Sequence, residues 1–428
     1  ITLAATASVG LGAVVITLAY SVGTAIPLLA ITYGGRNLLT SHPWLIRNTS
    51  NIQRGFGVLM LVTAIAITFS WDRTFQTYIL EKFPQYGTGL TKLEDNAIVQ
   101  SQLNKLKEGK PMFDMLTDTD YGNAPEFIPG GEWINSDPLT MRELRGKVVL
   151  VDFWTYTCIN CIRTLPYIKS WWEKYKDKGL VIVGVHTPEF EFEKNLDNVK
   201  KAVNDFGLTY PIMQDNDYAT WQAYTNRYWP AKYMVDKTGK IRYTHFGEGE
   251  YDETERMIQK LLAEAGSAID ETINNPIYQV QTRTPETYLG YQRMAGLVSP
   301  ERVIPDKPVT FTAPTDLKRN TFALSGTWTV GAERAMPAKG ATLTYHFDAT
   351  EVFLVMRPKT LGAAGAVRVY LDGKPVPAEF SGEDVSNSNV KINGDRLYKL
   401  VKLPSPGPHV LKLEVLDSDI ELYAFTFG

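Results

Sequence analysis

Two cysteines, Cys158 and Cys161, carry the clearest chemical signal in this sequence of 428 residues. They are the only cysteines in the chain, and the two residues between them give a spacing typical of a redox-active dithiol. A disulfide scaffold or a four-thiolate zinc site would need more cysteines. The five histidines are scattered and show no spacing that indicates a metal site. The pair therefore predicts thiol–disulfide exchange.

The residues around the cysteines predict a strand followed by a helix. Residues 147–154 (KVVLVDFW) form a continuous apolar run, which is typical of a strand buried on both faces. Residues 162–175 have a helical pattern. Cys158 would then lie at the entry to the helix, where unpaired N–H groups and the helix dipole favour a thiolate. We expect Cys158 to attack a substrate disulfide and Cys161, one turn deeper, to resolve the mixed disulfide.

Asp152 is the predicted proton acceptor of this site. It lies in the apolar strand between Val151 and Phe153, which argues for a buried carboxyl group. Burial raises the pKa of a carboxyl group, so that it can take the proton from Cys161 as that thiol attacks. The alternative is an aspartate at a strand end that faces water.

The pattern of elements after the cysteines continues as an α/β domain over residues 111–266. We expect a second buried strand at 180–186, helices at 199–206 and 254–265, and a hairpin of strands 233–236 and 241–246. A connector over 267–305 follows. Short alternating runs without helices then predict an antiparallel β-sandwich of the jelly-roll type over 306–428. The expected strands include 341–347, 352–357, 397–403 and 409–415, and turn residues such as 404–407 separate them.

The predicted sandwich contains aromatic residues that could stack against sugar rings. Aromatic side chains on alternating strand positions are more often core or cross-strand pairs than a sugar-stacking platform. We therefore expect a recognition or docking module, with contact to cell-wall glycan as the alternative. The residues concerned are Trp328, Tyr345, Tyr370, Tyr398 and Tyr423.

The N-terminal part predicts membrane association. Residues 9–33 form an apolar run long enough to span a bilayer, and residues 55–71 form a second run at the short end of the spanning range, for which a buried globular helix is the alternative. We expect a partial transmembrane domain over 1–76 and a linker over 77–110. The loop between the runs carries arginines and no acidic residue, which predicts a cytoplasmic loop and an extracytoplasmic remainder. The chain opens on Ile, so we expect it to be a piece of a longer membrane protein.

The net charge of −3 argues against nucleic-acid binding.

Several motifs resemble those of one known family. Asp152, Pro166 and Pro230 lie at the spacing found in thioredoxins relative to the two cysteines, and the distance from Cys158 to Pro230 leaves room for an extra strand and helix. Four sequence segments are similar to those of the DipZ family of membrane thiol–disulfide proteins. These segments are residues 153–161 (FWTYTCINC), 186–190 (HTPEF), 228–231 (YWPA) and 246–249 (FGEG).

The resemblance implies roles for further residues. Pro230 would be a cis-proline, and the backbone of Trp229 would pair with the substrate strand; Trp154 would complete the substrate-binding set. Family members join a transmembrane electron conduit to an outer thioredoxin-like domain and a C-terminal sandwich similar to carbohydrate-binding modules. The chain lacks the membrane cysteines of that conduit, and Thr164 stands where related thioredoxins often carry a glutamate.

These observations predict a multidomain protein with transmembrane α-helices, a thioredoxin-like domain and a β-sandwich similar to carbohydrate-binding modules. We expect a membrane-anchored, extracytoplasmic bacterial thiol–disulfide oxidoreductase, more a reductase than an oxidase, acting on protein disulfides. It would need no cofactor beyond the Cys158–Cys161 disulfide. A thiol peroxidase of the same fold and a glycan-binding surface protein are the alternatives.

Overall fold

The computed structural model describes residues 121–276, 282, 284–360 and 362–428. The chain divides into two units, Ile1–Tyr121 and Gly122–Gly428, and nearly all described residues belong to the second. The predicted transmembrane domain (1–76) and the following linker (77–110) lie outside the described residues. Within the part that is described, no helix is long and apolar enough to span a bilayer.

The predicted fold class therefore needs correction. The described ranges contain four α-helices, all in the thioredoxin-like region, followed by a β-rich C-terminal region. Membrane-spanning helices are not part of the fold that these elements define.

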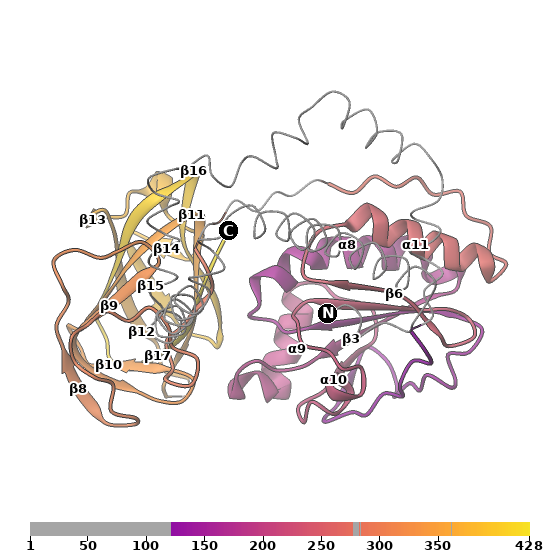
Figure 1. The fold of residues 1–428 in the computed structure, drawn as a ribbon, viewed down its shortest axis with the longest axis horizontal. Helices are drawn as coiled ribbons and strands as arrows, with labels where there is room; N and C mark the ends of the chain where they lie inside the picture. Colours follow the sequence, from indigo (N-terminus) through magenta and orange to yellow (C-terminus); the bar gives the residue numbers. More distant parts are fainter. Residues whose placement is uncertain (1–120, 277–281, 283, 361) are drawn as a thin grey trace, which may run out of the picture. The chain divides into compact units, whose positions relative to one another are not determined.

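The thioredoxin-like domain is built on a six-stranded sheet with the order β1-β4-β3-β2-β5-β6 (Figure 1). β2, β3 and β4 are parallel to one another, and β1, β5 and β6 pair in antiparallel fashion. The strands are β1 (Trp133–Ile134), β2 (Val148–Trp154), β3 (Leu180–His186), β4 (Ile212–Gln214), β5 (Ala231–Val235) and β6 (Ile241–Phe246).

The central strand β2 is buried over its whole length, which explains its uninterrupted apolar sequence. Because successive side chains point to opposite faces of a strand, its residues divide between two cores. The odd-numbered positions pack in one cluster with Met213 and Tyr233. Val148, Leu150 and Trp154 pack in the other cluster, which includes Cys161. Asp152 has the same parity and therefore lies on the Cys161 side of the sheet.

The helices agree with the expected α/β pattern. α8 follows β2 and contains Pro166, and β4 with α10 supplies the extra strand and helix expected between the cysteines and Pro230. The predicted strands 180–186 and 241–246 coincide with β3 and β6. The four helices are α8 (Ile159–Tyr175), α9 (Leu196–Asp205), α10 (Ala219–Ala223) and α11 (Tyr251–Glu264).

The C-terminal domain is an antiparallel structure of eleven strands that form one connected sheet, not two separate ones. β11 pairs with β16, β17 and β9, while β10 joins β17 to β9, so the sheet closes over its own core. The strands are β7 (Thr287–Tyr288), β8 (Pro308–Phe311), β9 (Thr321–Val330), β10 (Ala335–Pro337), β11 (Thr342–Pro358), β12 (Gly365–Leu371), β13 (Lys374–Pro375), β14 (Val385–Ser386), β15 (Asn389–Ile392), β16 (Arg396–Val415) and β17 (Ile420–Phe427).

Two long strands account for the difference from a simple sandwich. The expected strands 341–347 and 352–357 are halves of β11, and 397–403 and 409–415 are halves of β16. The Pro- and Gly-containing segment 404–407, expected to be a turn, is accommodated by a register shift opposite residues 349–351. β7 lies in the segment expected to be a connector and pairs with β17.

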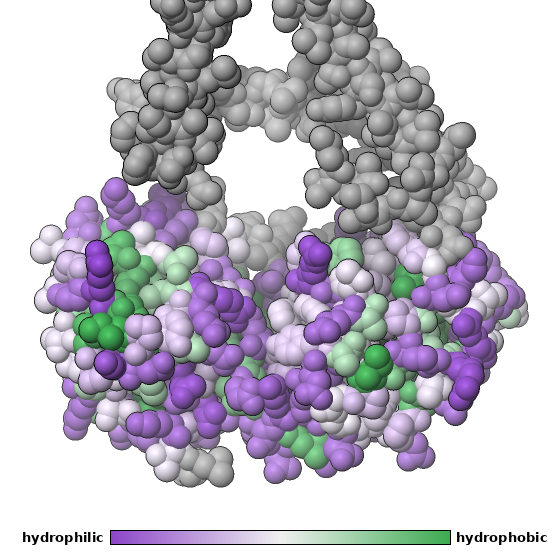
Figure 2. Space-filling model, turned by 60° about the horizontal axis from the view of Figure 1, so that its bottom comes forward, coloured by the Kyte–Doolittle hydropathy of each residue, from purple (hydrophilic) through white to green (hydrophobic). Residues whose placement is uncertain are grey.

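The aromatic residues of this domain do not form a sugar-stacking surface. Trp328, Tyr345, Tyr398 and Tyr423 are at most 2% exposed, and Tyr370 is half-buried with its hydroxyl group donating to Glu414. The face of the described domains in Figure 2 is mainly hydrophilic, with hydrophobic residues in small separate groups. These aromatic side chains therefore serve packing, the reading that alternating strand positions favoured.

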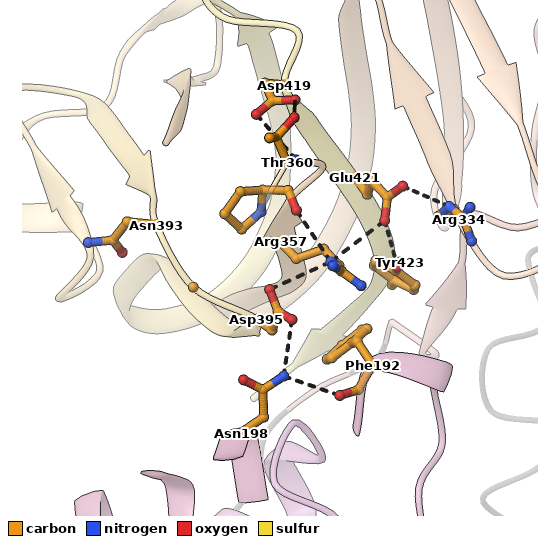
Figure 3. Close-up of polar contacts among 12 residues, drawn as sticks. Phe192, Asn198, Arg334, Arg357, Thr360, Asn393, Asp395, Asp419, Glu421 and Tyr423 are labelled. Atoms are coloured by element: carbon orange, nitrogen blue, oxygen red, sulfur yellow. Dashed lines mark hydrogen bonds and ion pairs between the residues drawn. The ribbon is translucent and has the colours of Figure 1, made fainter. Parts of the chain in front are cut away.

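Aromatic and polar contacts join the C-terminal domain to the thioredoxin-like domain. Phe192, in the short helix η2 (Glu191–Lys194), packs against Tyr423 of β17 with ring centroids 4.9 Å apart. Beside it, Asn198 of α9 donates to Asp395 at 3.1 Å, and Asp395 also pairs with Arg357 at 3.5 Å (Figure 3). The two domains thus share a packed boundary.

The packing around β3 yields a stability prediction. A Cβ atom at Gly184 would lie 3.0 Å from Tyr210 and 3.1 Å from the indole nitrogen of Trp154. Because overpacking forces neighbouring groups to shift, Gly184→Ala should lower the free energy of unfolding by about 1–3 kcal/mol. Urea unfolding followed by fluorescence measures this. Gly394→Ala, where a Cβ meets nothing within 4 Å, is the matched control, and equal midpoints for the two variants would contradict the prediction.

Candidate redox site

Cys158 lies at the N-terminus of α8, as predicted. It is the N-cap residue with extended backbone angles (φ −75°, ψ 112°), and its sulfur accepts a hydrogen bond from the N–H of Cys161 at 3.2 Å. Cys158 is half-buried, Cys161 is 1% exposed, and both are free thiols. The half-buried sulfur of Cys158 therefore receives one N–H group of the helix N-terminus, while Cys161 is shielded from solvent.

Cys161 is held in its neutral form by its surroundings. Burial, followed by the hydrogen bond and charge of Cys158 and by the charge of Asp152, raises the pKa of the Cys161 thiol well above its usual range. A thiol of this kind attacks a neighbouring disulfide only when a base removes its proton. The site therefore requires a proton acceptor on the inner side of α8.

Asp152 is placed to be that acceptor. It is 1% exposed and lies on the face of β2 that packs beneath α8. Burial, partly offset by Lys232, raises its pKa to about 6. Within the described residues, Oδ1 of Asp152 has no hydrogen-bond partner, so a lone pair remains available for a proton. The predicted burial of this carboxyl group is confirmed.

Lys232 is a second buried charge, and the sequence patterns above did not predict it. It is directly opposite Asp152 in the β2–β5 pairing and is fully buried. Opposed residues of an antiparallel pair project to the same side of the sheet, so Lys232 also lies beneath α8. Burial lowers the pKa of its ammonium group, against the attraction of Asp152 and Cys161. Its position two residues after Pro230, within an otherwise apolar strand, was the available signal.

Glu193 is the other missed residue, and it fixes the loop in front of Cys158. Its fully buried carboxylate accepts from the hydroxyl group of Thr157 at 2.6 Å and from the N–H groups of Glu189 and Phe190 at 2.6 and 3.0 Å. Burial raises its pKa to about 7 despite these donors. Nothing in the charged sequence EFEK predicted a buried carboxylate, because the side chain that it accepts from, Thr157, lies in another loop.

The Trp229–Pro230 peptide bond is cis, as the resemblance implied. The indole of Trp229 donates to the carbonyl of Thr187 at 3.0 Å, which holds this segment beside Cys158. Trp229 borders a groove of about 300 Å³ at the redox site. The groove is lined by Cys158, Asn160, Glu189, Arg227, Tyr228, Trp229, Glu286, Tyr288 and Arg293.

Trp154 does not belong to this groove. Its side chain is fully buried and makes an edge-to-face contact with His186 at 5.2 Å. The prediction that Trp154 contacts substrate is therefore corrected: its even position on β2 directs it into the core that contains Cys161. The side chain of Trp154 therefore packs beneath the redox site.

No metal site accompanies the dithiol in the parts of the chain that are described, where no three His, Cys, Asp or Glu side chains are grouped to bind an ion. The chemistry available to the described residues is that of a dithiol, a buried base and an adjoining groove.

The fold and the site define a thioredoxin-like thiol–disulfide oxidoreductase. Residues 123–244 match the AhpC/TSA family, and residues 284–428 match the thioredoxin-like C-terminal domain family. The thiol-disulfide oxidoreductase YkuV of Bacillus subtilis is 33% identical over 33% of this chain and 94% of its own length. The thiol-disulfide oxidoreductase ResA of Bacillus thuringiensis is 28% identical over 32% of this chain and 76% of its own length.

One relative is similar over almost the whole sequence. Protein DipZ of Mycobacterium tuberculosis is 33% identical over 99% of this chain, and the matched part is 60% of the DipZ sequence. The chain belongs to the DipZ family, and it spans less than two thirds of the length of these relatives.

The buried carboxyl group of Asp152 makes stability depend on pH. Its pKa rises from 3.8 in the unfolded chain to about 6 in the folded one, so the folded state binds the proton more tightly. Stability from this group is therefore lost as pH rises from about 4 to 6. Asp152→Asn should match the wild type below pH 4 and exceed it by about 3 kcal/mol at pH 7. Urea unfolding across this range measures the difference, and a constant difference at all pH values would refute the assignment.

Proposed function

We propose that this chain reduces protein disulfides through Cys158 and Cys161. The observation that carries the proposal is the arrangement of an accessible sulfur at a helix N-terminus, a buried second thiol and a buried carboxyl group beneath it. The Cys158 thiolate attacks one sulfur of the substrate disulfide, and the other sulfur leaves as a thiolate that takes a proton from water. Cys161 then transfers its proton to Asp152 and attacks the sulfur of Cys158. The second substrate thiolate leaves, and the chain retains the Cys158–Cys161 disulfide.

The groove supports a protein substrate. Among the described residues, neither the backbone N–H nor the C=O of Trp229 takes part in a backbone hydrogen bond. These groups lie beside Pro230 at the edge of the groove that contains Cys158. An extended substrate segment would pair with them as an added strand.

The proposed direction is reduction, and it rests on the DipZ family membership. A separate dithiol must return two electrons to the Cys158–Cys161 disulfide after each cycle, and no organic cofactor is required. The DipZ family membership supports an extracytoplasmic, membrane-attached location with electrons supplied through the membrane.

A thiol peroxidase is the second candidate, because residues 123–244 match the AhpC/TSA family. In that reaction the Cys158 thiolate would attack one peroxide oxygen, the O–O bond would break, the other oxygen would leave as water, and Cys158 would become a sulfenic acid. Cys161 would then condense with it to the disulfide and release a second water. Stopped-flow oxidation by hydrogen peroxide separates the two functions: a rate no faster than that of a free thiol removes the peroxidase.

Replacing one cysteine at a time tests the assigned order of attack. Cys161→Ser should accumulate a mixed disulfide between Cys158 and the substrate, because no second thiol is present to resolve it. Cys158→Ser should form no adduct and should lower reduction to the uncatalysed rate. Intact-mass spectrometry after incubation with a peptide disulfide measures both. An adduct on Cys161 in the Cys158→Ser protein would reverse the assignment.

The direction of electron flow is tested by the reduction potential of the pair. We expect a value near that of thioredoxin, about −270 mV, and not near the strongly oxidising value of about −120 mV. Equilibration with glutathione or dithiothreitol buffers, followed by thiol alkylation, gives this potential. A value at the oxidising end would make the chain an oxidase and leave the order of attack unchanged.

A further inference from the structure

The groove beside Cys158 has walls from two domains. The thioredoxin-like domain contributes the Cys158 loop and the Trp229 segment. The C-terminal domain contributes Glu286, Tyr288 and Arg293, which lie before, in and after β7. A second hollow, of about 220 Å³, continues along the same boundary past Trp229, Tyr288 and Arg293. A substrate that reaches Cys158 through this groove therefore also meets the C-terminal domain.

Tyr288 is the centre of the wall that the C-terminal domain supplies. Its backbone pairs with Ala424 of β17, which ties it to the main sheet. Its hydroxyl oxygen lies 2.8 Å from a carboxyl oxygen of Glu189 and 2.6 Å from one of Glu286. A phenol has one hydrogen to donate, so the second short contact needs a proton on a carboxyl group. The three side chains therefore form one hydrogen-bonded unit across the domain boundary.

Arg293 fixes the same wall from the other side. Its guanidinium group pairs with Glu189 at 3.0 Å and lies over the ring of Tyr288 at 3.6 Å from the centroid. The preceding chain is held closely, because a Cβ atom at Gly290 would collide with the backbone of Glu333. These contacts give the wall a defined position relative to Cys158.

The rest of the boundary holds this wall in place. Phe192 packs against Tyr423. The guanidinium group of Arg357 lies 5.7 Å from the centre of the Phe192 ring. The polar contacts of Asn198 and Asp395 continue the boundary (Figure 3). The C-terminal domain is thus packed against the thioredoxin-like domain next to the redox site as well as at the groove itself.

We propose that Glu286, Tyr288 and Arg293 form the second wall of the substrate site and restrict it to an extended, cysteine-containing polypeptide segment. The inference rests on the proposed reductase function. A groove of about 300 Å³ is at the small end of ligand sites and admits a strand with its side chains, whereas the face of a folded protein would collide with the wall. The free backbone edge of Trp229 on one side and the hydroxyl and carboxyl groups on the other match the hydrogen-bonding groups of an extended peptide.

The test compares three disulfides with the complete chain. The first is a small chromogenic aromatic disulfide, the second an extended ten-residue peptide carrying one cysteine as a mixed disulfide, and the third a folded protein with one surface disulfide. For Tyr288→Ala, the ratio of kcat/KM for the peptide to that for the small disulfide should fall about tenfold, through a higher KM. The rate for the folded protein should rise, because the wall is shortened.

Two further variants separate contact from folding. Tyr288→Phe removes only the hydroxyl group and should lower the same ratio less than Tyr288→Ala. Tyr291→Ala, on the same segment but outside the groove, is the matched control and should leave all three rates unchanged. An unchanged peptide-to-small-disulfide ratio in Tyr288→Ala with a native circular dichroism spectrum would overturn the inference. A wild-type chain that reduces none of the three disulfides would instead refute the proposed function.

Discussion

The burial of Asp152 and Lys232 beneath the redox helix is the constraint on which the rest of this site depends. Both side chains lie in the layer that contains Cys161, on directly opposed positions of β2 and β5. Removing charged groups from water is costly unless they are paired or neutral. Burial accordingly raises the pKa of Asp152 and lowers the pKa of Lys232, and both shifts favour the neutral forms. A carboxyl group with a pKa of about 6 can both accept and release a proton near neutral pH, which is what resolution by a buried thiol requires.

A second buried acid shapes the approach to the same cysteine. Glu193 connects the loop before Cys158 to the segment that carries Glu189 and Phe190. Glu189 in turn contacts Tyr288 and Arg293 of the C-terminal domain. A continuous set of hydrogen bonds thus runs from the residue preceding the proposed nucleophile to the opposite wall of the groove. In this arrangement the C-terminal domain belongs to the surroundings of the redox site and is more than an attached module.

The elements that could be predicted from the sequence are those whose signal is local. The cysteine spacing, the apolar run of β2, the buried Asp152 and the strand β3 depend on neighbours in the chain or on burial on both faces. The long strand β16 was divided because the proline- and glycine-containing stretch 404–407 normally ends a strand. Here a register shift against the partner strand absorbs it. The expected transmembrane helices were a local hydropathy inference, and no helix in the described ranges has that character.

The sequence by itself determined the reacting pair, the carboxyl group near it and the proline that follows in the chain, because two-residue spacings and buried-strand patterns are encoded locally. Only the tertiary structure decided that Lys232 faces Asp152, that Glu193 is buried, that Trp154 points into the core and that Tyr288 borders the groove. Each of these depends on which distant segments pair, as β2 does with β5 and β7 with β17. The surroundings of these side chains follow from that pairing, which local patterns do not specify.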